Sequence, residues 1–210
     1  EELSTELAQA TQKFSENVLD STNAWQKNIV DESLLEGLPP SAKIAARETA
    51  KQKEMDGWLF TLHAPSIMPI MKYLADSSLR KEFWEASSKI GWEGEQDNTD
   101  LIRTILELRQ EKAVLLGKKD YADVVLERRM AGSGARADEF VSDLKEKTTL
   151  AFGRENDQLI AFKGEKTGDT DELLEPWEHS YWSEKQMKEK YDFDEEDMRP
   201  YLPIDSVLSG

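Results

Sequence analysis

The chain has 210 residues, no cysteine and a formal net charge of −16. Without cysteine, disulfides, thiol nucleophiles and Cys-ligated zinc are excluded, and the acidic balance argues against nucleic acid and anionic membranes as partners, because phosphates are bound by basic surfaces. The composition, 38% hydrophobic and 33% charged, is typical of a folded soluble chain, and no apolar run approaches the roughly 20 residues of a membrane span.

Helical periodicity begins at the first residues. Apolar side chains recur at spacings of three, four and seven: Leu3, Leu7, Ala10, Phe14, Val18 and Trp25. This pattern predicts one amphipathic helix over residues 2–30. A short helical turn over residues 31–40 follows, stopped by Gly37, and Ser41 is the predicted N-cap of a helix over residues 41–56.

One short β element interrupts the helices. The run WLFTL at residues 58–62 is aromatic and β-type, which predicts a strand, and residues 63–65 form a turn. Ser66 is then expected to cap a helical stretch over residues 67–90. That helix should tolerate Pro69 because the proline lies in its first turn.

Residues 99–116 carry the clearest helical pattern. Asp97, Asn98 and Thr99 are candidate caps, and Gly117 supplies the stop. The predicted apolar face is broad enough for a core helix and consists of Leu101, Ile105, Leu108 and Leu115, widened by Ile102, Leu106, Ala113 and Leu116.

The remaining elements are also helical. Helices are predicted over residues 121–131, 139–162 and 176–191, with residues 163–172 as an exposed polar loop. No repeat period is found. One strand among seven or eight helices predicts an all-α fold, a mainly helical array with one short β element near residues 58–62.

Two histidines are the candidates for imidazole chemistry. His63 lies in a turn beside a proline with no acid in ligand spacing, so a structural role is the favoured interpretation. Glu175 and His179 are four residues apart and could present two ligands on one helical face, but Pro176 intervenes and no third ligand is evident. A structural role is favoured there too.

No catalytic motif is found in the sequence. HExxH, GxSxG and GxxxxGK[ST] are absent. The AGSGA run at residues 131–135 is interpreted as a flexible loop, and DFDEED at residues 192–197 lacks the central Gly and the final Glu of an EF-hand loop. We therefore predict no catalytic, cofactor-binding or metal-ligating residue in this chain.

Eight phrases occur along the chain in a telling order: FSENVLDSTNAW (14–25), GLPPSAKIAA (37–46), GWLFTLHAPSIMPIMKYL (57–74), LRKEFWEA (79–86), DNTDLIRTILELRQEKAVLLG (97–117), YADVVLERRMA (121–131), EPWEHSYWSEK (175–185) and MRPYLPIDSVLSG (198–210). In this combination, the chain resembles the thimet oligopeptidase and oligopeptidase A family of zinc metallopeptidases along nearly its whole length.

The resemblance implies a two-lobed helical peptidase fold with a channel between the lobes and zinc at the channel floor. The family's zinc ligands come from an HExxH helix and a downstream Glu, which lie beyond the region matched here. Residues 1–210 are therefore expected to be a single helical segment of a larger peptidase, without its catalytic half.

The expected function is that of a scaffold and channel-wall segment. The full-length parent would be a zinc metalloendopeptidase that hydrolyses peptide bonds in short peptides, and its partners would be those peptides. The segment alone would bind no zinc, cut nothing, and expose apolar faces where the catalytic half packs.

Two other interpretations stay open: a stand-alone helical peptide- or protein-binding module without catalysis, and an unrelated helical scaffold. Because the chain opens without Met and already in helical rhythm, we expect a segment of a longer protein. The missing cysteine and the lack of a signal-peptide pattern favour the cytoplasm, or an organelle if a transit peptide was removed.

Overall fold

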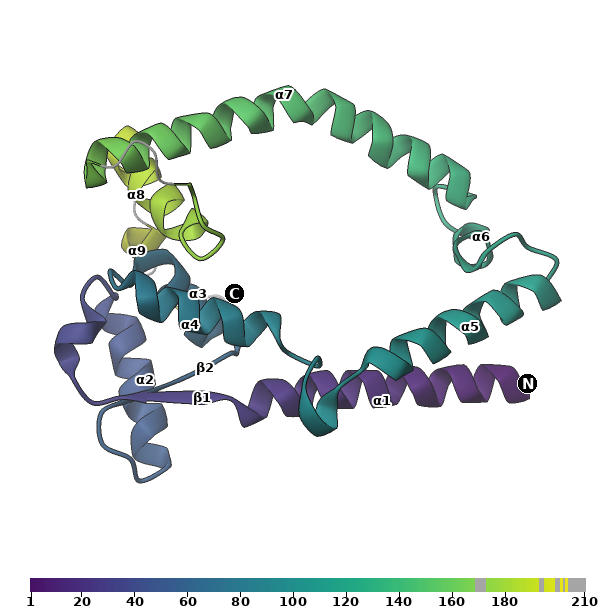
Figure 1. Cartoon of the computed structure of the whole chain (residues 1–210), viewed down its shortest axis with the longest axis horizontal. Helices are drawn as coiled ribbons and strands as arrows, with labels where there is room; N and C mark the ends of the chain where they lie inside the picture. The colour runs from purple at the N-terminus through teal and green to yellow at the C-terminus, as the bar shows by residue number, and fades with distance from the viewer. Residues whose placement is uncertain (169–172, 193–194, 199–200, 202, 204–210) are drawn as a thin grey trace. The chain divides into compact units, whose positions relative to one another are not determined.

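The computed structural model describes residues 1–168, 173–192, 195–198, 201 and 203. Its elements, in chain order, are α1 (Glu2–Ala24), β1 (Gln26–Ile29), the 3-10 helix η1 (Glu32–Leu35), α2 (Pro40–Gln52), β2 (Trp58–Thr61), α3 (Ala64–Tyr73), α4 (Ser77–Ser88), the 3-10 helix η2 (Gly94–Gln96), α5 (Thr99–Leu115), α6 (Tyr121–Leu126), α7 (Gly134–Thr167), α8 (His179–Tyr191) and α9 (Glu195–Met198) (Figure 1). Helices dominate and the strands pair in one two-stranded sheet, so the predicted all-α class with one short β element is confirmed.

The chain divides into two compact units. Unit 1 consists of Glu1–Ala24 and Lys89–Asn156, and unit 2 consists of Trp25–Ser88 and Asp157–Gly210. Helix α7 therefore contributes its first part to unit 1 and its last part to unit 2.

The prediction of one helix over residues 2–30 is wrong at its C-terminal end, where the chain forms a strand of the sheet in unit 2. Helix α1 ends at Ala24, and β1 pairs antiparallel with β2 in the register Gln26↔Thr61 to Ile29↔Trp58. The helical pattern fails there because Ile29 is buried by a strand far along the chain, which local periodicity does not report. Gly57, with φ +91°, allows this approach, since a Cβ at that position would collide with the Ile29 carbonyl oxygen.

The core of unit 2 gathers side chains from β2 and from the helices around it. Its described hydrophobic residues that are at most 2% exposed are Leu35, Ala50, Leu59, Phe60, Ile70, Leu74 and Phe83. Phe83 lies edge-on against Trp25, with ring centroids 4.9 Å apart, and also against Phe60. These contacts hold α4 against the sheet.

The helices of unit 2 begin and end differently from the prediction. Helix α2 starts at Pro40, and the Ser41 hydroxyl donates to Glu196 Oε2 (2.9 Å) in place of capping. Helix α3 starts at Ala64, so Pro69 lies in its second turn, and the Ser66 hydroxyl accepts a hydrogen bond from the Thr61 N–H (2.9 Å). Neither hydroxyl caps its helix, because Ser41 bonds a side chain far along the chain and Ser66 bonds the backbone of the preceding strand.

The helical stretch predicted over residues 67–90 is two helices. Helix α3 ends at Tyr73, and Leu74 has the extended backbone angles φ −62° and ψ 126°. Helix α4 begins at Ser77, where Asp76 Oδ1 accepts a hydrogen bond from the Leu79 N–H (2.9 Å). The break turns the Leu74 carbonyl away from helical bonding, and a side chain described below uses it.

In unit 1, α1 packs along α5 through a buried polar pair. Asn17 Nδ2 donates to Asn98 Oδ1 (2.9 Å), and Asn98 Nδ2 donates to the Phe14 carbonyl (3.2 Å). Asn98 therefore joins the two helices, while Asp97 Oδ1 accepts from the Thr99 N–H (2.8 Å) and hydroxyl (2.6 Å) at the start of α5. The predicted helix over residues 99–116 is confirmed to within one residue.

The broad buried face predicted for α5 is wrong in part. Ile105 and Ala113 are buried, but Ile102, Leu106 and Leu115 are 42%, 58% and 70% exposed. Within the described residues only α1 and α6 contact α5 closely, which leaves the rest of the apolar face uncovered.

Helix α7 is longer at both ends than the predicted range 139–162. It begins at Gly134, whose N–H donates to Asp123 Oδ1 (2.7 Å), and Ser133 Oγ accepts from the Arg136 N–H (3.2 Å). It continues to Thr167, so residues 163–167 of the predicted loop are helical, and residues 169–172 of that loop lie outside the described residues. Lys163 is 1% exposed because an ion pair replaces its water.

Candidate functional site

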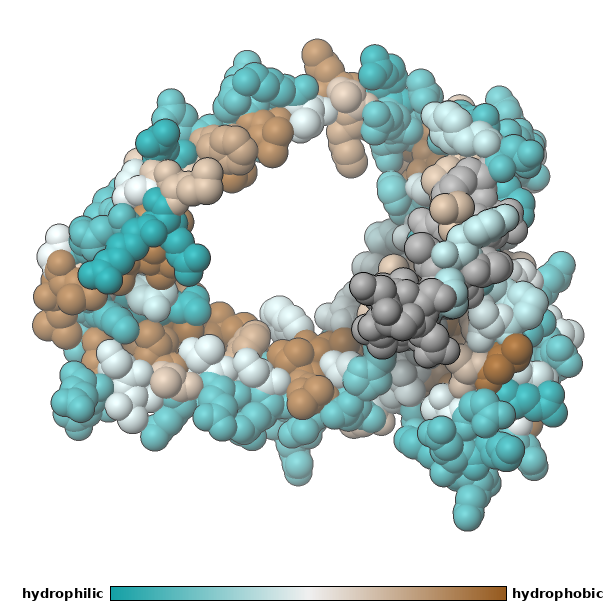
Figure 2. Space-filling view, turned by 180° about the vertical axis from the view of Figure 1, so that it is seen from behind, coloured by the Kyte–Doolittle hydropathy of each residue, from teal (hydrophilic) through white to brown (hydrophobic). Residues whose placement is uncertain are grey.

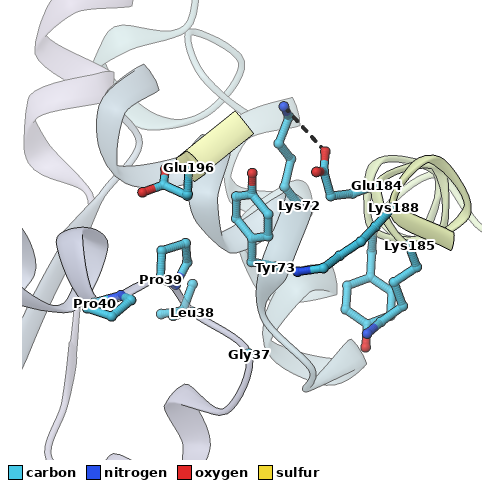
Figure 3. Close-up of a pocket in the computed structure, with 11 residues that line it drawn as sticks. Gly37, Leu38, Pro39, Pro40, Lys72, Tyr73, Glu184, Lys185, Lys188 and Glu196 are labelled. Carbon is cyan, nitrogen blue, oxygen red and sulfur yellow. Dashed lines mark ion pairs between the residues drawn. The ribbon is translucent and has the colours of Figure 1, made fainter. Parts of the chain in front are cut away.

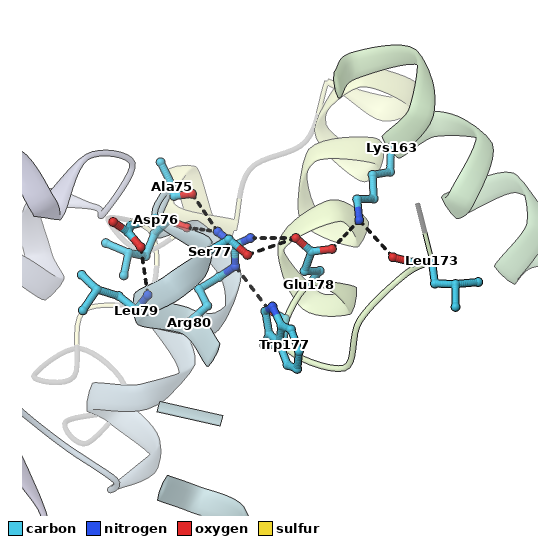
Figure 4. A network of polar contacts seen from close by, with 10 residues as sticks. Ala75, Asp76, Ser77, Leu79, Arg80, Lys163, Leu173, Trp177 and Glu178 are labelled. Carbon is cyan, nitrogen blue, oxygen red and sulfur yellow. Dashed lines mark hydrogen bonds and ion pairs between the residues drawn. The ribbon is translucent and has the colours of Figure 1, made fainter. Parts of the chain in front are cut away.

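A cluster of three buried charges lies in unit 2. Arg80 on α4, Lys163 on α7 and Glu178 just before α8 are 1%, 1% and 7% exposed (Figure 4). Glu178 Oε2 is 2.5 Å from Lys163 Nζ, and Glu178 Oε1 is 3.7 Å from the nearer guanidinium nitrogen of Arg80. One carboxylate therefore faces two cations from different helices, which is how proteins accommodate buried charge.

The cluster is completed by backbone carbonyls and one hydroxyl. Arg80 donates to the carbonyls of Leu74 (2.6 Å), Ala75 (2.9 Å) and Trp177 (3.2 Å). Ser77 Oγ donates to Glu178 Oε1 (3.1 Å), Lys163 Nζ donates to the Leu173 carbonyl (3.1 Å), and the Arg80 guanidinium lies 4.0 Å from the centre of the Tyr181 ring. The residues are Leu74, Ala75, Ser77, Arg80, Lys163, Leu173, Trp177, Glu178 and Tyr181.

Electrostatics support a fixed, charged cluster. Burial lowers the pKa of Arg80 from its ordinary value, and Tyr181, Glu178 and Asp76 act against that shift. Arginine stays protonated in proteins, so the guanidinium keeps its charge and its donors. The arrangement holds α4, α7 and the start of α8 together and offers no activated nucleophile.

A cleft of about 340 Å³ lies beside this cluster, between α3 and α8 (Figure 3). Among the described residues, the charged side chains that line it are Lys72, Lys185, Lys188, Glu184 and Glu196. Lys72 Nζ and Glu184 Oε2 meet across it at 3.6 Å, as Figure 3 shows. The described lining of the cleft therefore carries charges of both signs, and Lys72 and Glu184 are paired with each other.

Neither of the two histidines is part of the buried charge cluster. His63 is the exposed residue that precedes α3, and its carbonyl accepts from the N–H groups of Ser66 (2.8 Å) and Ile67 (3.0 Å). His179 is the exposed first residue of α8. Glu175 precedes α8, so Glu175 and His179 do not share a helical face.

The Gly-Ser-Gly run and the acidic run were the other two motifs considered as possible sites. The Gly-Ser-Gly run ends in the first residue of α7, and Ser133 bonds the helix start. Part of the acidic run 192–197 lies outside the described residues.

The zinc implied by the family resemblance was tested against the side chains present. Within the part of the chain that the structure describes, no three His, Asp or Glu side chains gather in a way that could hold a metal ion. The described residues therefore do not fit a zinc site. The absence of catalytic, cofactor-binding and metal residues from this segment stays a prediction.

Sequence reasoning missed the buried charge cluster. The polarity of residues 163–172 predicted exposure, yet Lys163 follows the buried Leu159 and Phe162 on the same helix. The position of Lys163 at the edge of an apolar helix face could have indicated its burial. The phrase EPWEHSYWSEK, which contains Glu178, could have indicated its partner.

Within the described ranges, no helix has the length and apolar character required to cross a membrane.

Comparison with known proteins gives consistent matches. The model of Peptidase family M3 matches residues 70–210. Oligopeptidase A of Salmonella typhimurium (strain LT2) is 37% identical over 214 residues, covering 100% of this chain and 31% of that protein. The organellar oligopeptidase A (chloroplastic/mitochondrial) of Arabidopsis thaliana is 36% identical over 212 residues, covering 98% of this chain and 27% of that protein.

A probable cytosolic oligopeptidase A of Arabidopsis thaliana is 37% identical over 213 residues, covering 98% of this chain and 30% of its own length. The chain thus spans about a third of the length of the relatives it matches. Because the family model covers more than half of the chain and these relatives align with nearly all of it, the chain belongs to Peptidase family M3.

Proposed function

We propose that this chain is a scaffold segment of a zinc-dependent oligopeptidase, an enzyme that hydrolyses peptide bonds in short peptides. The observation that carries the proposal is the similarity to oligopeptidase A along the whole chain, which nevertheless covers only 31% of that relative. In this proposal, residues 1–210 are one segment of the larger peptidase, and its zinc ligands and general base lie in the remaining sequence. The segment alone is inactive and binds no zinc.

The proposed role of the segment is to wall a channel. A wall must keep its helices in place while peptides pass, and the buried cluster around Glu178 fixes three helices of unit 2 by charge-assisted bonds. A narrow channel admits an unfolded short peptide and excludes a folded chain on steric grounds. Selectivity for short peptides then needs no specific contact from this segment.

A peptidase assay tests the proposal. A quenched fluorescent peptide is incubated with zinc and either the 210-residue chain or the full-length natural polypeptide, each with and without a chelator. Chelator-sensitive cleavage by the full-length polypeptide alone is the expected result. Cleavage by the 210-residue chain would overturn the assignment of catalysis to the remaining sequence, and cleavage by neither would overturn the enzymatic proposal.

A second candidate is a stand-alone peptide- or protein-binding module, and the cleft between α3 and α8, whose described lining includes Lys185 and Lys188, favours it. Fluorescence anisotropy with labelled acidic peptides would test it on the 210-residue chain. Binding that is lost in Lys185→Glu and Lys188→Glu, but kept in Lys119→Glu on the exposed surface of unit 1, would support a module. If no saturable binding is measured, the binding-module candidate is excluded.

We also propose a cytoplasmic location. The relatives carry names of both kinds, organellar and probable cytosolic, so subcellular fractionation of the natural protein decides between them.

A further inference from the structure

Helix α7 carries one apolar stripe along most of its length. The stripe follows positions 140, 144, 148, 151, 155, 159 and 162, which are three or four residues apart and so share one face of a helix. Val141 and Phe152 widen it, and Thr148 and Glu155 are its polar members.

The C-terminal part of the stripe is covered by another helix. Leu159 and Phe162 are 4% and 8% exposed and pack in one cluster with Tyr181 and Trp182 of α8. The rings of Phe162 and Trp182 are edge-on, with centroids 6.3 Å apart. This end of the stripe is therefore covered by an aromatic face of α8, a helix of the same polypeptide.

The N-terminal part of the same stripe is uncovered. Phe140, Val141, Leu144 and Phe152 are 66%, 60%, 49% and 67% exposed. Figure 2 shows hydrophobic side chains lying open among hydrophilic ones along this helix. Large apolar side chains in one row on a helix mark a surface that another element covers, because leaving them in water forgoes their burial energy.

We propose that the stripe over residues 140–152 is covered by a helix from the part of the peptidase polypeptide that lies outside these 210 residues. Two observations select this occupant. The stripe continues into one that a helix of the same chain already covers, and about two thirds of the length of the matched relatives has no counterpart here. The inference rests on one part of the proposed function, namely that this chain is a segment of a longer polypeptide, and does not depend on the activity of that polypeptide.

The stripe over residues 140–152 is an apolar surface whose flanks carry little net charge, so charge does little to select its partner. Residues 134–156 carry four basic and five acidic side chains, so the flanks of the stripe are nearly neutral. The occupant is therefore expected to present an apolar helix face like that of α8, with few charges at its centre.

Hydrogen–deuterium exchange tests this directly. The 210-residue chain and the full-length natural polypeptide are exchanged in parallel, and peptides covering residues 138–152 and 157–164 are compared. We expect residues 138–152 to exchange at least about tenfold more slowly in the full-length polypeptide, and residues 157–164 to be protected alike in both.

Substitution locates the contact. In the full-length polypeptide, Leu144→Glu should restore fast exchange over residues 138–152 while residues 157–164 keep their protection, which shows that the protein is folded. Thr149→Glu adds the same charge off the stripe, where Thr149 is exposed, and should leave both regions unchanged.

Two results would overturn the proposal. One is fast exchange of residues 138–152 in the full-length polypeptide. The other is protection in the 210-residue chain that rises with its concentration, which would assign the stripe to a second copy. Because exchange is read without any substrate, an inactive polypeptide with a protected stripe would refute the proposed function and leave this inference standing.

Discussion

The two ends of α7 carry the same pattern of apolar residues in different surroundings. Leu159 and Phe162 are buried against α8, and the neighbouring Lys163 is held by Glu178. Phe140 and Leu144, about four to six turns earlier on the same face, remain in water. The difference shows that a helix pattern specifies a face for burial, while stability comes only from the element that covers it.

The largest expected effect is on the covered end. Glu178→Ala leaves Arg80 and Lys163 buried without their shared carboxylate, which costs about 3–5 kcal/mol of unfolding free energy. Tryptophan fluorescence in urea measures it, because five of the six tryptophans lie in unit 2. The exposed Glu175→Ala is the control and should change the midpoint little. An unchanged midpoint in Glu178→Ala would mean that the cluster does not hold these helices.

A pair of leucine truncations compares the two ends directly. Leu159→Ala removes a side chain that is 4% exposed and should cost about 2–4 kcal/mol. Leu144→Ala, at 49% exposure on the same face, should cost less than about 0.5 kcal/mol in the 210-residue chain. Thermal and urea unfolding of both variants measure the two losses of unfolding free energy. Equal losses would contradict the contrast between the ends.

Unit 1 has its own buried anchor, with a smaller expected effect. Asn98→Leu leaves the buried Asn17 Nδ2 without its acceptor, at a cost of about 1–3 kcal/mol. The double change Asn17→Leu with Asn98→Leu should recover part of that loss, since both partners are then apolar. Exchange protection of α1 and α5 reports the result. A double variant worse than the sum of the two single variants would show that packing, and not the hydrogen bond, is limiting.

The smallest effect is on the pH dependence of α5. The Thr99 hydroxyl and backbone N–H bond the carboxylate of Asp97 and lower its pKa below the ordinary value. A lowered folded-state pKa stabilises the fold fully above the ordinary value of about 4, and that contribution is lost as pH falls through the folded-state pKa. The difference in unfolding midpoint between the natural chain and Asp97→Asn should therefore stay constant from pH 7 down to the ordinary value and shrink as the pH falls below about 4. A difference that stayed constant below that pH would exclude this titration.

Local signals predicted the elements whose ends are decided locally. The extent of α5 followed from Asp97 and Thr99 at its start and Gly117 after its end, because capping bonds reach only two or three residues. The strand at β2 was predicted from its aromatic and β-branched side chains. Its partner β1 was not, since Gln26-Lys27-Asn28-Ile29 has no strand pattern and becomes a strand only by pairing with β2.

The sequence by itself determined the helical class, the family and the extent of α5, because periodicity, capping residues and ordered phrases are properties of the chain alone. Tertiary structure alone decided which parts of the apolar helix faces are covered and which charges are buried. Arg80, Lys163 and Glu178 read individually as surface residues, and only their convergence from three elements makes burial tolerable. The physical reason is that burial of a charge depends on partners brought together by packing, which no local pattern records.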